Sequence, residues 1–359
     1  MTRLIPIQST DYSALAAFCA SKPERTLALD LWERRFRFWW DENPAFQTGW
    51  VRGWMLQDET SIVGVLVDIP SHIQLLGQMV TVSNLSLLRI LPEHQQESIR
   101  LLSALLTDTK SRPVFCTTTT PELASVLRGF RFRNLTEYFI EHLFVTNTSF
   151  LAGQLIQKKK LPQFLAYPAA MVTRLFQKVY GWIDSSRTGN LHVRLLHDAG
   201  PEFDRLWQRT DHQFSFTNLR SASDLNWILC SNPVHHLVLF GCYTCDETLI
   251  GYGLFVHLST ENPENTGRLL CLDLWSEWTS ITPFVAMIRG AIRYSEKKRL
   301  SMLIVPEYHE IIGRAVAQSG FSIRRIFPAT LYCRLPRGVA LGINSEESRL
   351  SGYFGDTVL

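Results

Sequence analysis

An acidic residue, Asp273, interrupts an apolar segment that runs from Leu270 to Leu274. Burying a carboxylate without a partner is costly, so this side chain must either face a cleft or be hydrogen-bonded. In a cleft it could act as the base that removes a proton from a nucleophile. With a partner it would be a structural residue that organises the neighbouring turn. The sequence leaves both interpretations open.

His212 is a second candidate for proton transfer, because an imidazole titrates near neutral pH. It lies in the mixed polar and aromatic segment Asp211-His212-Gln213-Phe214. A histidine in such a segment is more often found at a helix end or on the surface. We favour that interpretation over a proton shuttle.

Other histidines and cysteines do not form a metal-binding pattern. His235 and His236 are adjacent and would point to opposite faces of a regular strand, so they cannot jointly bind one ion. Cys242 and Cys245 form a single Cys-x-x-Cys without a partner pair. We therefore predict no metal site.

These residues belong to a chain whose two halves repeat one order of elements. In each half an Asn-Pro pair ends a Trp-bearing segment, and two β-rich stretches joined by Asp-Glu-Thr follow. A central strand, an amphipathic helix, a further strand and a short helix ending in Gly-Phe come next. The matching segments are 43–44, 50–56, 58–60, 62–67, 85–90 and 129–130 in the first half, and 232–233, 237–240, 246–248, 249–256, 269–274 and 320–321 in the second.

Matched elements in the same order predict a duplicated domain. We expect an N-terminal domain at residues 1–146, a helical linker at 147–190, a C-terminal domain at 191–338 and a tail at 339–359. This division agrees with the length of the chain, since domains typically contain roughly 100–200 residues.

The expected linker carries three consecutive lysines, Lys158 to Lys160, and an apolar stripe. The stripe has helical spacing, which favours a helix that packs across both domains. A helix lying on a membrane surface is the alternative. The stripe consists of Met171, Leu175, Val179 and Trp182.

The repeated unit resembles the GNAT superfamily of acyltransferases. The likeness is more specific in the first half, where residues 90–100 lie at the family's strand, Pro-Glu pair and pyrophosphate-binding turn. In that turn, backbone N–H groups and a helix N-terminus face the pyrophosphate of coenzyme A. The resemblance implies a mixed α/β (α+β) fold with two consecutive GNAT-like acyl-CoA N-acyltransferase domains. It also implies that acetyl-CoA or another acyl-CoA is bound by Ile90, Gln95, Gln96, Ser98 and Arg100.

The sequence departs from the family pattern at several positions. Gln95 keeps the first position of the turn motif, but Ser98 and Arg100 stand where the family has glycine or alanine. Ser125 replaces the usual general-acid tyrosine, and residues 276–281 of the second half contain no glycine. These departures keep open a catalytically inactive binding or assembly protein of the same fold.

The second half looks like the tandem acyltransferases of bacterial envelope and polysaccharide gene sets. The residues that carry this likeness are 223–227, 232–233, 272–274 and Gly355-Asp356. It implies transfer of an acyl group from a coenzyme A thioester to an amine or hydroxyl of an unidentified acceptor.

A basic and aromatic segment, residues 34–40, keeps open an aminoacyl-tRNA donor, as in the Fem-like branch of this fold. At helical spacing its aromatic residues form one apolar stripe, with Arg34 and Arg37 toward solvent. We therefore favour a helix that packs against the core.

Composition limits the class of protein. The chain has 359 residues, 46% of them hydrophobic, and 36 basic against 33 acidic side chains, a net charge too small for a dedicated nucleic-acid binder. No apolar run approaches the ~20 residues of a membrane-spanning helix, the first residues do not resemble a signal peptide, and the seven cysteines are irregularly spaced. We expect a cytoplasmic protein that binds a small-molecule acyl donor and an acceptor, without DNA. The oligomeric state is left open.

Overall fold

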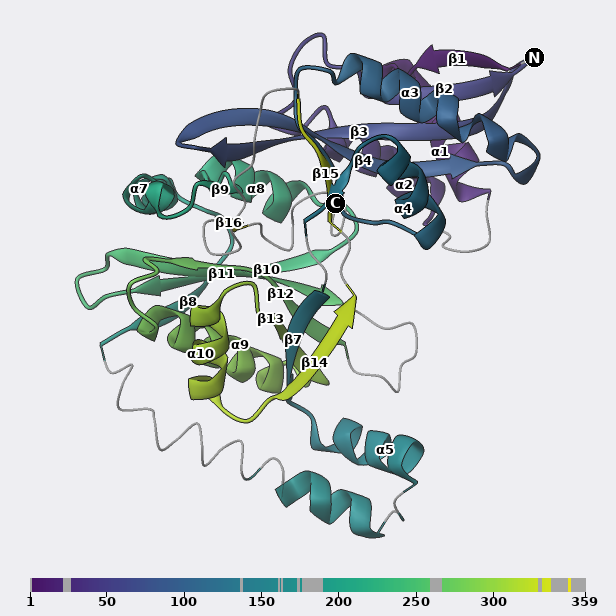
Figure 1. Cartoon of the computed structure of the whole chain (residues 1–359). Helices are drawn as coiled ribbons and strands as arrows, with labels where there is room; N and C mark the ends of the chain where they lie inside the picture. The colour runs from purple at the N-terminus through teal and green to yellow at the C-terminus, as the bar shows by residue number, and fades with distance from the viewer. Residues whose placement is uncertain are drawn as a thin grey trace.

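The computed structural model describes residues 2–21, 27–135, 138–160, 162, 164–172, 175, 190–258, 267–328, 331–336 and 348–349. Two mixed β-sheets lie one above the other, with helices α7 (Pro201–Thr210) and α8 (Ala222–Ser231) between them (Figure 1). Each sheet is built mainly from one half of the chain, and the helices of that half cover both of its faces.

The first sheet has the strand order β1-β2-β3-β4-β5-β15-β6, with β9 paired to β3 and β16 paired to β9. Neighbouring strands are antiparallel except for the parallel pairs β4–β5 and β16–β9. The strands are β1 (Arg3–Pro6), β2 (Gly53–Asp58), β3 (Ser61–Leu75), β4 (Gln78–Ile90), β5 (Val114–Cys116), β6 (Arg133–Asn134), β9 (Phe216–Asn218), β15 (Tyr332–Arg334) and β16 (Ser348–Arg349).

The second sheet has the order β8-β10-β11-β12-β13-β7-β14. Only its β12–β13 pair is parallel among the described strands. The strands are β7 (Tyr138–Val145), β8 (His192–Leu196), β10 (His236–Tyr243), β11 (Leu249–Leu258), β12 (Arg268–Ser276), β13 (Met302–Pro306) and β14 (Ile323–Pro328).

The two halves exchange a strand. β7 from the first half lies between β13 and β14, and β15 from the end of the second half lies between β5 and β6. The two inserted strands hold the same place in their sheets, so the strand orders are equivalent. Each half therefore completes its sheet with hydrogen bonds from the other half.

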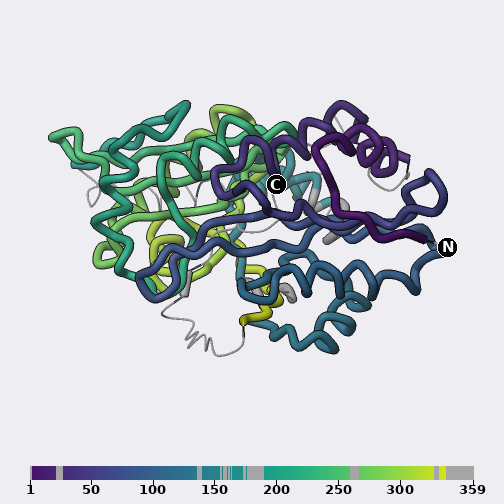
Figure 2. The backbone as a smooth tube through the Cα atoms, turned by 90° about the horizontal axis from the view of Figure 1, so that it is seen from above, coloured from purple at the N-terminus to yellow at the C-terminus, as the bar shows by residue number. Residues whose placement is uncertain are grey.

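The repeated hairpin is confirmed in both halves. The Asp-Glu-Thr segments join β2 to β3 and β10 to β11. In both turns the glutamate adopts a left-handed conformation, with φ of 53° at Glu59 and 63° at Glu247. The next hairpin, β3–β4, is longer and reaches from the first half toward the second, where β3 pairs with β9 (Figure 2).

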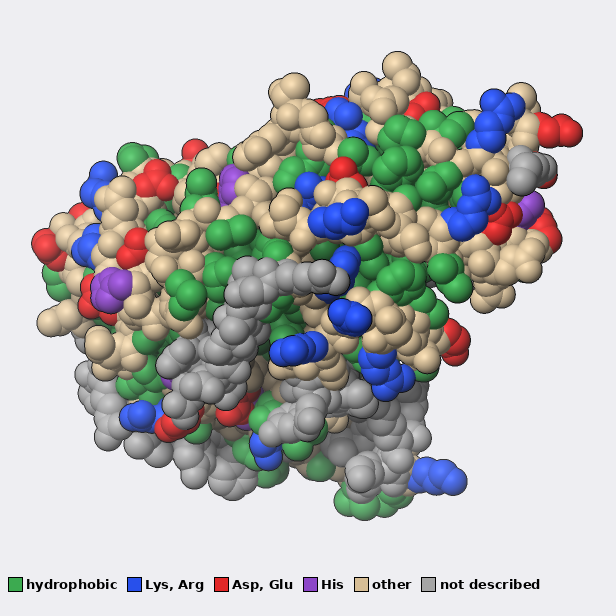
Figure 3. Space-filling model, turned by 45° about the horizontal axis from the view of Figure 1, so that its top comes forward, with side chains coloured by type: hydrophobic (Ala, Val, Ile, Leu, Met, Phe, Trp, Pro, Cys, Tyr) green, Lys and Arg blue, Asp and Glu red, His purple; other side chains and the backbone are tan. Residues whose placement is uncertain are grey.

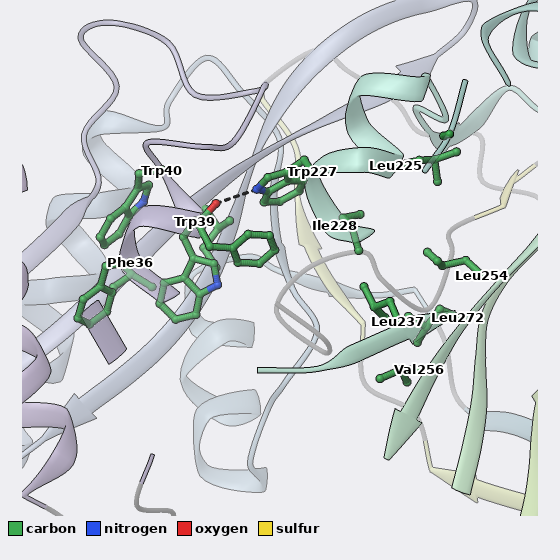
Figure 4. Packing of buried hydrophobic residues seen from close by; sticks show 14 of the residues in the cluster. Phe36, Trp39, Trp40, Leu225, Trp227, Ile228, Leu237, Leu254, Val256 and Leu272 are labelled. Carbon is green, nitrogen blue, oxygen red and sulfur yellow. Dashed lines mark hydrogen bonds between the residues drawn. The ribbon is translucent and has the colours of Figure 1, made fainter. Parts of the chain in front are cut away.

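Helices on the facing sides of the two sheets form one continuous apolar core. Trp227 of α8 stacks on Phe38 of α2 with ring centroids 4.9 Å apart, and its indole N–H donates to the Phe38 carbonyl at 2.8 Å (Figure 4). The aromatic stripe of residues 34–40 is buried while Arg34 and Arg37 are exposed, as predicted. The facing helices are α1 (Tyr12–Ala20), α2 (Leu29–Trp39), α7 (Pro201–Thr210) and α8 (Ala222–Ser231).

The opposite faces of the sheets are covered separately. In the first half α3 (Ser98–Asp108) and α4 (Pro121–Gly129) pack on the sheet, and α3 follows the short 3₁₀ helix η2 (Pro92–Glu97). In the second half α9 (Thr282–Lys297) and α10 (Glu310–Ser319) do the same. The amphipathic stripes expected after each central strand therefore form the helices predicted there.

The segment between the halves forms α5 (Thr148–Lys159) and a second helix at residues 164–172. Both lie at one end of the molecule, away from the stacked sheets (Figure 1). The second helix buries Ala166 and Ala170 but exposes Met171, so its apolar stripe is not packed across both sheets in the described residues. Val179 and Trp182 lie outside the described residues.

No helix in the described part of the chain is long and apolar enough to cross a bilayer.

Candidate functional site

In both halves the two parallel strands at the centre of the sheet diverge. β4 pairs with β5 only at Ser83 and Asn84, yet β4 continues to Ile90. β12 pairs with β13 from Arg268 to Leu270 and continues to Ser276. Among the described strands, the second part of each central strand thus has no strand pairing on that side, and we call this unpaired edge the opening.

A β-bulge lies in the diverging part of each central strand. In β4, Leu87 and Leu88 together oppose Leu66, and Leu87 has a φ of 50°. In β12, Leu272 is the extra residue between the positions paired to Leu254 and Phe255. A bulge turns one backbone N–H out of the regular ladder and can present it to a bound group. Each half therefore has an opening with a bulged strand beside it.

The opening in the first half is accessible. The β4 residues from Leu87 to Ile90 are only partly buried, although β4 lies in the middle of its sheet. Directly beyond them, η2 leads into the N-terminus of α3. Gln95, Gln96 and Arg100 are exposed and Ser98 is partly exposed. The five residues predicted to bind the donor thus lie together along the end of β4, η2 and the first turn of α3.

A carboxylate occupies the start of α3. Glu97 accepts hydrogen bonds from Thr2 and Arg100, and His94 Nδ1 lies 3.3 Å from its other oxygen. The hydrogen bond from Thr2 is the main cause that lowers the pKa of Glu97. Arg100 is half-exposed, with 47% of its side chain accessible, while its guanidinium donates to Glu97 and to the hydroxyl and carbonyl of Thr2. The helix N-terminus and Arg100 favour an anion here, whereas Glu97 opposes one.

The matching opening in the second half is filled by aromatic side chains. Trp275 on β12 is fully buried, and its indole N–H donates to Thr210 at 2.8 Å. Trp278, in the turn before α9, contacts Trp275, Phe214 and His309 with ring centroids 4.9 to 5.9 Å apart. The backbone N–H of Trp278 is already used, donating to a Gln213 oxygen at 2.7 Å. The end of β12 is therefore covered by the protein's own residues, although Glu277, Thr279 and Ser280 of the turn itself are exposed.

Asp273, the predicted base, lies inside this filled region. Its side chain is fully buried and accepts from Arg220 Nε at 2.8 Å and from the Tyr252 hydroxyl at 2.7 Å. Arg220 also donates to Thr217 and stacks 3.8 Å over the ring of Trp275. A partnered carboxylate of this kind fits the structural interpretation, and an acceptor could reach it only if the aromatic residues moved.

His212, the other predicted proton carrier, lies in the short 3₁₀ helix η4 (Asp211–Gln213). Its side chain is 76% exposed, and its Nδ1 is 3.7 Å from Asp211. This position agrees with the helix-end and surface interpretation. Asp273 and His212 therefore do not share one environment, since one is buried and the other is on the surface.

Asp68 is a titratable residue that the sequence analysis did not select. It lies on β3, next to Val67, the partner of Ser86 just before the β4 bulge. Its carboxyl accepts from Ser83 at 2.8 Å and from Arg112 at 3.1 Å. Burial raises the pKa of Asp68 to about 7, against the opposing effects of Arg112 and Ser83. The sequence signal that could have identified Asp68 is its position as an acidic residue inside the apolar run 62–69.

A second pair that was not predicted joins the two halves. His72 on β3 lies 3.2 Å from Asp224 at the start of α8, and both side chains are largely buried. These residues are 152 positions apart. Among the described residues there is no group of three or more His, Cys, Asp or Glu that could hold a metal ion.

No protein-family model matches the chain, and no sequence match to a curated protein was found. Solved structures with the same fold were found. A probable N-acyltransferase of Enterococcus faecalis V583 has 9% identity and a TM-score of 0.60, covering 93% of this chain and 72% of its own. Saccharomyces cerevisiae N-myristoyltransferase with bound myristoyl-CoA has 10% identity and a TM-score of 0.58, covering 93% and 83%. A GCN5-related N-acetyltransferase of Kribbella flavida has 13% identity and a TM-score of 0.58, covering 93% and 71%.

These similarities confirm the predicted GNAT-like fold, a mixed α/β architecture over most of the chain. At such low identity they establish the fold, while activity has to be argued from the site.

Proposed function

We propose that the protein is an acyltransferase that uses an acyl-CoA thioester and binds it in the first half. The observation that carries the proposal is the accessible opening beside the β4 bulge, which continues into the N-terminus of α3. Structural neighbours include an N-myristoyltransferase with bound myristoyl-CoA, which supports a coenzyme A thioester as the donor.

The proposed reaction moves the acyl group from sulfur to an amine or hydroxyl. The acceptor atom attacks the thioester carbon, the carbon–sulfur bond breaks, and the coenzyme A thiol leaves with the proton that the acceptor loses. The backbone N–H freed at the bulge of Leu87 and Leu88 would polarise the thioester carbonyl. The pyrophosphate would lie at the turn formed by Ile90, Gln95, Gln96, Ser98 and Arg100.

The proton acceptor is a separate question. Asp273 and His212 remain the predicted bases, and each could accept the proton only under a different structural condition. Asp273 would require the second half to open, whereas His212 would require the acceptor to bind at the surface near η4. Asp273→Asn and His212→Ala separate these possibilities if acyl transfer is measured at saturating donor.

Hydrogen exchange of the full chain tests where the donor binds. We expect millimolar acetyl-CoA or a longer acyl-CoA to slow exchange at residues 86–101 of the first half. Residues 272–284 of the second half should be unchanged. A donor at ~100 times its dissociation constant should also stabilise the fold by about 2.7 kcal/mol. Protection of 272–284 alone would place the donor in the second half and overturn the proposal.

Two matched variants test the predicted turn. Arg100→Ala should weaken acyl-CoA binding roughly tenfold, because it removes the exposed guanidinium beside the helix N-terminus. Thr279→Ala, an exposed residue in the matching turn of the second half, should leave binding unchanged.

The alternative is a binding or assembly protein that retains the fold without catalysis. The carboxylate of Glu97 at the N-terminus of α3 favours this alternative, since it repels a pyrophosphate. If no acyl-CoA in a panel of chain lengths stabilises the protein or alters its exchange, the alternative is preferred.

A further inference from the structure

The helix at residues 164–172 is apolar on the side that it turns to solvent. Six large apolar residues between positions 164 and 175 are exposed, whereas eight are exposed in the rest of the described chain. The exposed fractions reach 75% at Phe164, 66% at Met171 and 63% at Leu175. The full set is Phe164, Leu165, Tyr167, Met171, Val172 and Leu175, which we call the outer apolar face.

Helical geometry explains why this face is not covered by the protein. Ala166 and Ala170 are four residues apart and fully buried, so they share one side of the helix, and Ala170 belongs to an apolar cluster with Leu151 and Ala152 of α5. At 100° per residue, Phe164, Met171 and Leu175 project from the opposite side of the helix. A surface helix normally places polar residues there, so an apolar outer side points to a binding surface.

The chain anchors this pair of helices firmly to the second half. Thr146, just before α5, donates its backbone N–H to Ser301 at 3.0 Å and its hydroxyl to the Leu300 carbonyl at 2.7 Å. Val145, at the end of the exchanged strand β7, belongs to the same small apolar cluster as α5. On the face shown in Figure 3, hydrophobic side chains lie beside both basic and acidic ones.

All charged residues of this segment are basic. Residues 142–183 contain no aspartate or glutamate and carry Lys158, Lys159, Lys160, Arg174 and Lys178. The whole chain has a net charge of +3, so the five basic residues here leave the remainder at 3 − 5 = −2. An apolar helix face in a segment whose charged residues are all basic complements a surface that is apolar inside and negatively charged outside.

We propose that the outer apolar face binds the surface of an anionic lipid bilayer. Phe164, Met171 and Leu175 enter the interface between headgroups and acyl chains, and the basic residues of the segment, of which Lys160 is exposed, attract anionic headgroups. The stacked sheets stay in water, because the two helices lie at one end of the molecule. The proposal is independent of the proposed acyl transfer, since it uses none of the residues of the donor site.

Flotation of the full chain with vesicles tests the proposal. We expect binding to vesicles of 70% phosphatidylcholine and 30% phosphatidylglycerol at 0.1 M NaCl, and binding to pure phosphatidylcholine at least tenfold weaker. Because each lysine near the surface contributes roughly fivefold, replacing Lys158, Lys159 and Lys160 with glutamine should weaken binding to the anionic vesicles about 100-fold. High salt should have a similar effect, because it screens the same charges.

The apolar contribution is tested by Met171→Gln and Leu175→Gln in one protein. This variant should lose vesicle binding, whereas the matched variant Leu195→Gln, at an exposed leucine of the second sheet, should retain it. Absence of binding to anionic vesicles even at 0.05 M NaCl would overturn the proposal. So would a concentration-dependent dimer in analytical ultracentrifugation that the Met171→Gln and Leu175→Gln variant abolishes, because a second copy would then cover this face. The outcome is separable from the proposed function, since acyl-CoA binding in solution is measured without vesicles.

Discussion

The two halves of the chain share one strand order but differ at the point where the central parallel strands diverge. In the first half the end of β4 remains partly exposed. In the second half the corresponding part of β12 is buried under Trp275 and Trp278, and Asp273 is ion-paired to Arg220. The same backbone can thus support a binding site in one copy and a sealed core in the other, depending on which side chains fill the opening.

The two halves are also joined to each other by the exchange of β7 and β15. Because each sheet contains a strand from the other half, neither half can complete its sheet without the other. The shared core around Trp227 and Phe38 adds a second connection. The two halves therefore share both strands and a core. If the halves differ as described, substitutions in the second half should have the larger effects on stability.

Removing the buried guanidinium should disrupt the sealed half most. Arg220→Met leaves the Asp273 carboxylate buried without its charged partner, so the free energy of unfolding should fall by about 4–5 kcal/mol in urea titrations. Arg194→Gln, which breaks the exposed pair of Arg194 with Glu247, should cause no measurable change. If Arg220→Met unfolds within 1 kcal/mol of the parent protein, the ion pair does not hold the second half closed.

Substitutions at two matching positions compare how tightly the two openings are packed. Trp275 pairs with Tyr252, directly after Gly251, and Arg89 pairs with Val65, directly after Gly64. Trp275→Ala should lower the free energy of unfolding by about 3–4 kcal/mol, because it leaves a cavity in a filled site. Arg89→Ala should cost about 1 kcal/mol, mainly through its lost hydrogen bond to the Cys19 carbonyl. Equal losses from urea unfolding of the two variants would contradict an open first half.

Asp68 should make the stability of the first half depend on pH. The folded state raises its pKa to about 7 from an ordinary value of 3.8, so between these values the folded protein holds a proton that the unfolded chain has lost. Stability from this group is therefore full below pH 4 and decreases as the pH rises toward 7, by about 2 kcal/mol between pH 5 and 7. Asp68→Asn should remove that decrease when urea unfolding is compared at the two pH values.

The control for Asp68 is an exposed aspartate in the second half. Hydrogen bonds, first that from Thr244, lower the pKa of Asp246 below its ordinary value. It therefore titrates below pH 5 in both folded and unfolded chains. Asp246→Asn should leave the change between pH 5 and 7 intact, and an equal effect of both variants would remove Asp68 as the cause.

The smallest expected effect concerns the carboxylate at the donor turn. Glu97→Gln removes a negative charge from the N-terminus of α3, so affinity for acyl-CoA should rise about fivefold in titration calorimetry. Glu93→Gln, an exposed residue of the same turn, serves as the matched variant and should change affinity less. A loss of affinity in Glu97→Gln would mean that Glu97 orients the turn for the donor.

The repeated sequence pattern predicted the hairpins and central strands because their signals are local. Alternating apolar residues on both sides of Asp-Glu-Thr specify a hairpin without contacts from distant parts of the chain. The bulge at Leu87 and Leu88 was not predicted, since two adjacent leucines carry no sign of which one leaves the ladder. The pairing of Asp273 with Arg220 was also beyond reach, because 53 residues separate them. The donor-binding role of residues 90–100 came from resemblance and stays a prediction.

The sequence by itself determined the repeated order of elements, because hydrophobic periodicity and turn residues act over a few positions. The GNAT-like fold class followed from the resemblance to that superfamily. Only the tertiary structure decided which strands were exchanged, which opening was filled, and which face of the 164–172 helix was left apolar in solvent. Those outcomes depend on contacts between residues far apart in the chain. An apolar stripe looks the same in the sequence whether it meets another element of the protein or remains exposed.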